Sequence, residues 1–176
     1  MIRLRLTLIK IKNKEETAVK LETQLTVVQL KSNMEVIESK WYNKEGANTA
    51  SIEDVEKLLN TTLPISTKEF LLWSNGGEGK LGDNYIYNGL IEDIVAYNND
   101  YGIHKYLQKE YLAFGMDGDI GYIFHLPNNS IYRVDLGDLD IASIKYIAPS
   151  FDDFLGKAIY LNFDKPQNIV DNSSTI

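Results

Sequence analysis

The sequence predicts an α+β fold, in which a central antiparallel sheet of about four to six strands is flanked by helices. Short apolar runs in its second half, bounded by turn-forming residues, indicate strands that follow one another in a meander. Capping residues placed ahead of apolar positions at helical spacing indicate the helices. The chain has 176 residues, of which 44% are hydrophobic, so it can form one globular domain with its own core.

The first 33 residues are predicted to form a β-hairpin extension of this domain. Apolar and polar side chains alternate from Ile2 to Leu8, and apolar residues resume between Val19 and Val27 after the polar segment NKEE. An isolated hairpin is only marginally stable, so this one would dock on the domain, pair with another chain or stay poorly ordered. The natural start could also be Met34, which opens the helical segment MEVIESKWY, and residues 1–33 would then be an upstream extension.

Two helices are predicted between residues 51 and 73. Ser51 is expected to cap the first helix, whose apolar residues recur at helical spacing up to Leu59. Ser66 and Glu69 have the spacing of a capping box, which predicts the start of a second short helix. We expect Trp73, near the end of this second helix, to lie in the core.

The stretch SNGGEGKLG, residues 74–82, contains four glycines and a lysine and so resembles a phosphate-binding loop. However, Lys80 is followed by Leu81, where a Ser or Thr would be needed to hold Mg²⁺. A phosphate loop also precedes a helix, whereas this stretch follows one and lies at its negative end. We therefore expect Gly76 and Gly77 to end the helix, at least one of them with a positive φ, and we expect no nucleotide binding.

The rest of the chain predicts a strand in DNYIYNGL and a helix over residues 91–107 with a weak point at Gly102. Four strands follow in EYLAFG, IGYIFHL, SIYRVD and SIKYIA, and the turns MDGD and PNNS join the first three. Ser150 and Asp153 form a second capping box, which opens the last helix, SFDDFLGKAIYL. The domain is predicted to span residues 34–163, followed by a flexible tail over residues 164–176.

The charge is unevenly distributed along the chain. Residues 1–33 carry seven Lys and Arg against three Asp and Glu, a formal +4, while residues 34–176 carry eleven against twenty-two, a formal −11. An acidic domain disfavours nucleic acid and anionic membranes as partners and favours basic proteins. Because the N-terminus lacks the uninterrupted apolar run of a signal peptide, the sequence predicts a soluble, cytoplasmic protein.

Catalytic and metal chemistry find little support in the sequence. The chain has no cysteine, and its two histidines, His104 and His125, have no evident partner that would orient them against a nucleophile. A Mg²⁺ site between the aspartates of MDGDIG and DLGDLD is imaginable, but aspartate beside glycine is ordinary turn chemistry. We therefore expect a protein without catalytic residues, metal or cofactor.

The order of several motifs resembles the SUKH superfamily, which contains the yeast cell-wall assembly regulator and many bacterial immunity proteins. The resemblance covers roughly residues 34–161, and the motif residues that carry it most specifically are Leu63, Pro64, Trp73, Asn75, Gly76 and Gly77. The segments MDGDIG and SFDDFL agree in order and spacing. The resemblance implies an α+β protein-binding domain whose bacterial members neutralise a toxin by direct contact.

Two functions follow from this resemblance. The favoured one is an immunity protein that binds a cognate toxin domain, and the alternative is a regulatory or scaffold protein of the cell-wall regulator type. Tyrosine is enriched at protein interfaces, and seven of the eleven tyrosines concentrate in the middle of the chain. The sequence predicts that a basic toxin domain is steered by acidic turns and contacted by tyrosines. The residues assigned to this interface are Tyr85, Tyr87, Asp117, Asp119, Asp138 and Asp140.

Overall fold

The fold is built around one antiparallel sheet of seven strands in the order β1-β2-β3-β4-β5-β6-β7. The structure is a computed structural model that describes residues 2–43 and 45–163. The strands are β1 (Trp41–Asn43), β2 (Gly77–Leu81), β3 (Asn84–Asn88), β4 (Tyr111–Asp117), β5 (Ile120–His125), β6 (Ser130–Asp135) and β7 (Lys145–Ala148). The predicted α+β class is confirmed, with more strands than the four to six expected.

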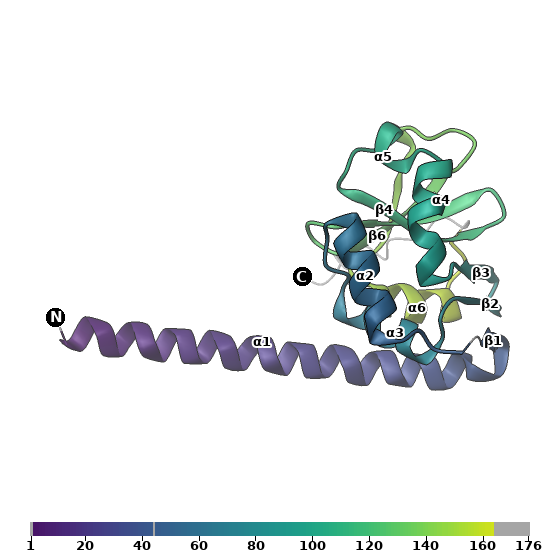
Figure 1. Ribbon diagram of the computed structural model, residues 1–176. Helices are drawn as coiled ribbons and strands as arrows, with labels where there is room; N and C mark the ends of the chain where they lie inside the picture. Colours follow the sequence, from purple (N-terminus) through teal and green to yellow (C-terminus); the bar gives the residue numbers. More distant parts are fainter. Residues whose placement is uncertain (1, 44, 164–176) are drawn as a thin grey trace, which may run out of the picture.

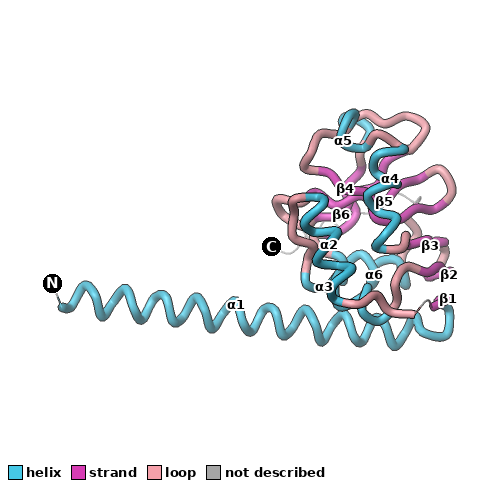
Figure 2. The backbone as a smooth tube through the Cα atoms, viewed as in Figure 1, coloured by secondary structure: helices cyan, strands magenta, loops and turns pink. Residues whose placement is uncertain are grey.

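Helices cover the sheet and connect its strands (Figure 1). The α-helices are α1 (Ile2–Ile37), α2 (Thr49–Leu59), α3 (Ile65–Trp73), α4 (Ile94–Asp100), α5 (Ile103–Tyr106) and α6 (Phe151–Tyr160). Three short 3-10 helices are η1 (Glu38–Lys40), η2 (Ile91–Asp93) and η3 (Ile141–Ser143). Figure 2 shows the strands lying together between these helices. Gly102, with φ +65°, separates α4 from α5, so the predicted weak point is a break between two helices.

The meander from β4 to β7 confirms the strand order predicted from the turn compositions. Asp117 pairs with Ile120 at one end of the β4–β5 hairpin, and His125 pairs with Ser130 at one end of the β5–β6 hairpin. Gly118 and Asn129 lie in these two turns with φ of +56° and +59°. Glycine and asparagine are the residues that adopt this left-handed conformation most readily, which explains how the turns form.

Aromatic residues fill the main core between the sheet and α6. Phe114 on β4 packs against Phe124 on β5, with ring centroids 4.4 Å apart, and against Phe151 and Phe154 of α6. The predicted capping box at the start of α6 is present: the Asp153 amide donates to Ser150 Oγ (3.2 Å), whose hydroxyl donates to Asp153 Oδ2 (2.6 Å). The sequence therefore predicted both the position and the cap of this helix.

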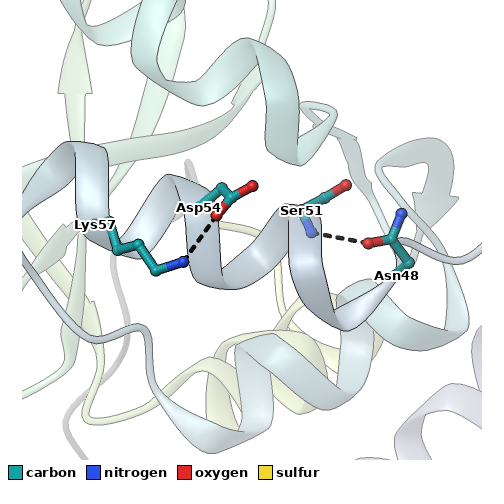
Figure 3. A network of polar contacts seen from close by, with 4 residues as sticks. All are labelled: Asn48, Ser51, Asp54 and Lys57. Carbon is teal, nitrogen blue, oxygen red and sulfur yellow. Dashed lines mark hydrogen bonds and ion pairs between the residues drawn. The ribbon is translucent and has the colours of Figure 1, made fainter.

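The other two predicted caps are wrong. Asn48 caps α2, because its Oδ1 accepts a hydrogen bond from the Ser51 amide (2.8 Å), and the helix therefore starts two residues before Ser51 (Figure 3). In α3 the N-cap is Pro64, which makes no side-chain cap, and Ser66 lies buried inside the first turn. Proline disfavours the helical conformation in the residue before it, so the helix begins directly after Pro64, at Ile65 and ahead of Ser66.

The predicted N-terminal β-hairpin is wrong, because residues 2–37 form the single long helix α1. No glycine or proline occurs before Gly46, so the strongest turn-forming residues are absent from this segment. Leu30 and Ile37 are fully buried against the domain, and the Asn33 side chain donates to the backbone oxygen of Asp152 (2.9 Å). The buried residues Leu30 and Ile37 lie two helical turns apart on the side that docks on the domain, and the helix continues beyond the domain (Figure 1).

The predicted flexible tail, residues 164–176, lies outside the described residues.

Candidate protein-interaction face

Part of the outer face of the sheet carries no helix, and exposed tyrosines lie on it. On β2 and β3 the side chains alternate between the buried core and the surface. The outward-pointing residues of β1, β2 and β3 are named here the tyrosine face: Tyr42, Glu78, Lys80, Tyr85 and Tyr87. The exposed fractions of Tyr42, Tyr85 and Tyr87 are 67%, 46% and 38%. Side chains held on paired strands lose little further freedom on binding, which suits an interface.

The strand register brings these residues into rows across the sheet. Tyr42 pairs with Glu78, Glu78 with Tyr87, and Tyr87 with Met116 of β4. Lys80 pairs with Tyr85 in the neighbouring row. Directly opposed cross-strand residues lie about 5 Å apart, so each row is a continuous strip of side chains.

A hydrogen bond fixes one tyrosine of this face. The Tyr85 hydroxyl donates to Glu78 Oε2 (2.6 Å), and this bond is the main reason why the pKa of Tyr85 is raised above its ordinary value. The bond holds the phenol ring over β2 and keeps a carboxylate beside it. The face therefore presents aromatic surface with a carboxylate at Glu78 and, opposite Tyr85, the exposed ammonium of Lys80.

Asp117 lies beside the tyrosine face, as the sequence-based grouping expected. Its Oδ2 accepts a hydrogen bond from the Tyr85 amide (3.2 Å), which ties the end of β4 to β3. Asp119 is exposed two residues further along the same turn. The structure therefore brings Tyr85, Tyr87 and Asp117 together, with Asp119 at the adjacent end of the sheet.

Asp138 and Asp140 do not join this group. Both lie in the loop after β6, which is two strands from β4, roughly 10 Å at the usual strand spacing. Asp140 caps η3 by accepting the Ala142 amide (2.8 Å), and Asp138 shares a surface depression with Arg133 and Lys145. The loop that carries both aspartates lies beside the β4–β5 turn, because the Leu136 amide donates to the Asp119 carbonyl oxygen (2.8 Å), and it lies outside the β1–β3 strands that carry the tyrosines.

The motif residues of the family resemblance lie at the junction of α3 and β2. Leu63 is buried, and its amide donates to Glu56 Oε1 (2.7 Å), while Pro64 is the N-cap residue of α3. Trp73 is only partly buried at the margin of the core. The fully enclosed tryptophan ring is that of Trp41, which contacts Phe70 edge-on at 5.7 Å.

Gly76 and Gly77 do not end the helix as predicted, because α3 ends at Trp73 and its C-cap is Ser74, whose backbone is extended with φ −144°. The predicted positive φ is confirmed at both glycines. Gly76 and Gly77 have φ of +76° and +122°, and the chain then enters β2. Asn75 fastens this loop to η2, because its Oδ1 accepts the Ile91 amide (2.9 Å) and its Nδ2 donates to Glu92 (2.9 Å). These six motif residues therefore shape the domain, and Gly77 lies on β2 next to the tyrosine face, with the Tyr42 carbonyl oxygen close to it.

A small pocket at the edge of the tyrosine face was not predicted from the sequence. Tyr87 and Met116 line it from the sheet, and Asp93 and Tyr97 line it from η2 and α4. The hydroxyl of Tyr97 is buried without a hydrogen-bond partner among the described residues, and burial raises the pKa of this tyrosine. The tyrosines clustered in the middle of the sequence pointed to this part of the molecule. The pocket itself, however, depends on how α4 packs against the sheet.

Within residues 2–43 and 45–163, no three His, Asp or Glu side chains are grouped so that they could hold a metal ion. None of the helices there combines the length and the apolar character needed to cross a bilayer.

Comparison with known proteins agrees with the fold. The sequence model of the SMI1 / KNR4 family (SUKH-1) matches residues 46–157, which run from the loop before α2 into α6. No curated protein sequence matches the chain. The matched segment includes six of the seven strands and the whole junction of α3 and β2. The chain therefore belongs to the SMI1 / KNR4 family (SUKH-1).

Proposed function

We propose that this protein is an immunity protein, which binds a cognate toxin domain through the tyrosine face and neutralises it by direct contact in the cytoplasm. The observation that carries the proposal is the group of three exposed tyrosines on paired strands, flanked by Glu78 and Asp117, in a SUKH domain. Binding alone is sufficient for this role, so the proposal includes no catalytic step and no cofactor.

In this proposal, charge attracts the partner over a distance and the tyrosines make the short-range contacts. The formal −11 of residues 34–176 attracts a basic protein from a distance and mainly raises the association rate. Tyrosine rings then supply contact area at a low cost in conformational entropy, and their hydroxyls can bind polar groups. A toxin domain that acts on nucleic acid needs a basic surface, and occupying that surface would block its substrate.

Co-expression with the toxin domain encoded beside this gene tests the proposal. We expect the protein to restore growth of cells that produce the toxin, and we expect the two purified proteins to form a complex. Tyr87→Ala should weaken the complex, whereas Tyr106→Ala, at a tyrosine that is 52% exposed on α5, should not. Absence of both growth rescue and complex formation would exclude the proposed function.

A regulatory or scaffold protein is the second candidate, because α1 extends well beyond the domain. Its exposed aliphatic residues Leu21, Leu25 and Val28 recur at helical spacing on one side. An exposed helix of this kind is suited to assembly with other proteins, whereas neutralising a toxin does not require it. If the neighbouring genes encode no toxin, and removal of residues 2–25 abolishes capture of a cellular partner, this second candidate would be favoured.

A further inference from the structure

The pocket beside Tyr87 has a floor of buried apolar groups and a rim of more exposed ones. Ile94, Ala113 and Phe114 form the floor and are at most 4% exposed. Tyr87, Met116 and Asp93 form the rim, and Tyr87 and Met116 are direct cross-strand partners. Because the rim residues are accessible and the floor residues are not, the pocket opens onto the edge of the tyrosine face.

The size of the pocket limits what can enter it. Its volume is about 40 Å³, and about 10–15 Å³ on this measure accommodates one water molecule. The pocket therefore has room for about three non-hydrogen atoms. The branched end of a leucine or the end of a methionine side chain has this size, whereas an aromatic ring does not fit.

We propose that this pocket is the anchor site of the tyrosine face and binds one aliphatic side chain of a basic partner protein. The proposal rests on the proposed function, since it assigns the anchor point of the same interface. Interface energy is usually concentrated in a few side chains that enter desolvated pockets and are surrounded by weaker contacts. Asp93 on the rim favours an anchor residue that is flanked by positive charge, in keeping with the acidic domain.

Gly89 provides a way to fill the pocket without disturbing the fold. It lines the pocket, and its φ lies outside the left-handed region that strains other residues. A Cβ atom built on Gly89 would meet only the Phe114 carbonyl oxygen within 4 Å, at 3.7 Å. Gly89→Val should therefore occupy the pocket at unchanged thermal stability, and Gly89→Ala should fill it only in part.

The first experiment uses leucinamide as the probe, because it combines a leucine side chain with a positive charge. We expect saturable NMR shifts of the Ile94, Ala113 and Met116 methyl groups, with a dissociation constant on the order of 10 mM for so small a ligand. Glycinamide has the same charge without the side chain and should cause no such shifts. Gly89→Val should abolish them, and their absence in the natural protein would overturn the inference.

The second experiment measures the affinity for the toxin domain encoded beside the gene. We expect Gly89→Val to weaken binding by at least about tenfold, the scale of one buried anchor residue, and Gly89→Ala to weaken it less. If the natural protein binds the toxin and Gly89→Val binds equally well, the anchor site is wrong while the proposed function stands. If the natural protein does not bind the toxin, the proposed function fails, and the leucinamide titration decides on the pocket alone.

Discussion

The backbone amide of Tyr85 donates a hydrogen bond to the carboxylate of Asp117, 32 residues later in the chain. Within the described residues, strands β3 and β4 pair at Tyr87 with Met116 and at Asn88 with Gly115. Beyond them the Asp117 carboxylate accepts the bond from the Tyr85 amide, in place of a strand carbonyl. One residue of the acidic turn thus holds a tyrosine of the candidate interface in position.

Replacing Asp117 should therefore loosen the end of β3 without unfolding the domain. Asp117→Ala removes the acceptor of an exposed amide, so we expect a loss of about 0.5–1.5 kcal/mol in the free energy of unfolding. Hydrogen exchange at the Tyr85 amide should become faster. Asp117→Asn keeps an acceptor oxygen and serves as the control, so equal exchange rates in both variants would contradict the bond.

Gly77 should be far less tolerant of substitution than Gly89. An added Cβ at Gly77 would lie 2.5 Å from Trp41 Nε1 and 2.7 Å from the Tyr42 carbonyl oxygen, at a φ of +122°. We expect Gly77→Ala to lower the free energy of unfolding by about 2 kcal/mol or more, as measured by chemical denaturation. Gly89→Ala is the matched control and should cost nothing; equal losses in the two variants would show that the Trp41 contact is misplaced.

The two tryptophans should differ in their contribution to stability. Trp41 is 5% exposed and is enclosed by Phe70, whereas Trp73 lies partly exposed at the margin of the core. Trp41→Ala should cost about 3–5 kcal/mol, and Trp73→Ala about 1–2 kcal/mol. Denaturant titrations of both variants measure these two losses of stability. A larger loss for Trp73→Ala than for Trp41→Ala would show that Trp73 lies at the centre of the core.

Asp152 should contribute less to the stability of the protein at neutral pH than in mild acid. Burial raises the pKa of this carboxyl above 3.8, and its Oδ1 has no hydrogen-bond partner among the described residues. The folded state therefore binds a proton more tightly than the unfolded state, and the contribution of Asp152 to stability falls as the pH rises from 3.8 through the folded pKa. Asp152→Asn should remove this fall and stabilise the protein at pH 7 by about 1 kcal/mol.

The neighbouring Asp153 provides the control for this effect. Its carboxylate accepts the Ser150 hydroxyl in the cap of α6, so Asp153→Asn should reduce stability at pH 7. Melting temperatures between pH 3 and pH 7 distinguish the two variants. Destabilisation by Asp152→Asn across this whole range would show that the carboxylate is better satisfied than its contacts indicate.

Charge on the β4–β5 turn should affect how fast the toxin binds. Asp119 is exposed and Asp117 is engaged with Tyr85, so Asp119→Lys changes the charge with little structural effect. We expect the Asp119→Lys variant to bind the toxin more slowly and its association rate to depend less on salt, because electrostatic attraction is screened beyond about 10 Å at 0.1 M salt. Glu110→Lys changes the net charge equally at the far end of β4. Identical rates for both variants would exclude local steering by this turn.

The sequence predicts the later strands well because their signals are local. Turn residues such as Gly118 and Asn129 fix the hairpins, and Ser150 fixes the start of α6. The N-terminal helix was missed because alternation from Ile2 to Leu8 fits a strand, while the helical repeat of Leu30, Met34 and Ile37 lies thirty residues later. Strand β1 was missed for the related reason that its residues were assigned to a helical segment.

The candidate interface could be predicted only in part. Tyr85 and Tyr87 alternate with buried residues on one strand, and this pattern is visible in the sequence. The pocket required knowledge of how α4 packs near the irregular pairing between Ala113 and Gly115, which no local pattern indicates. Asp138 and Asp140 were grouped with Asp117 and Asp119 because all four lie in acidic turns, and the structure places them in the loop after β6, next to the β4–β5 turn.

The position of β1 bears on where this protein can be shortened. Family similarity begins at residue 46, yet Leu30, Ile37 and Trp41 precede that point and are buried in the core. A fragment trimmed to the matched segment would lose these side chains and leave the backbone of β2 as an unprotected sheet edge. Unprotected edges template intermolecular pairing, so such a fragment should aggregate. The part of the chain that must be present for the domain to fold therefore extends further towards the N-terminus than the segment that matches the family.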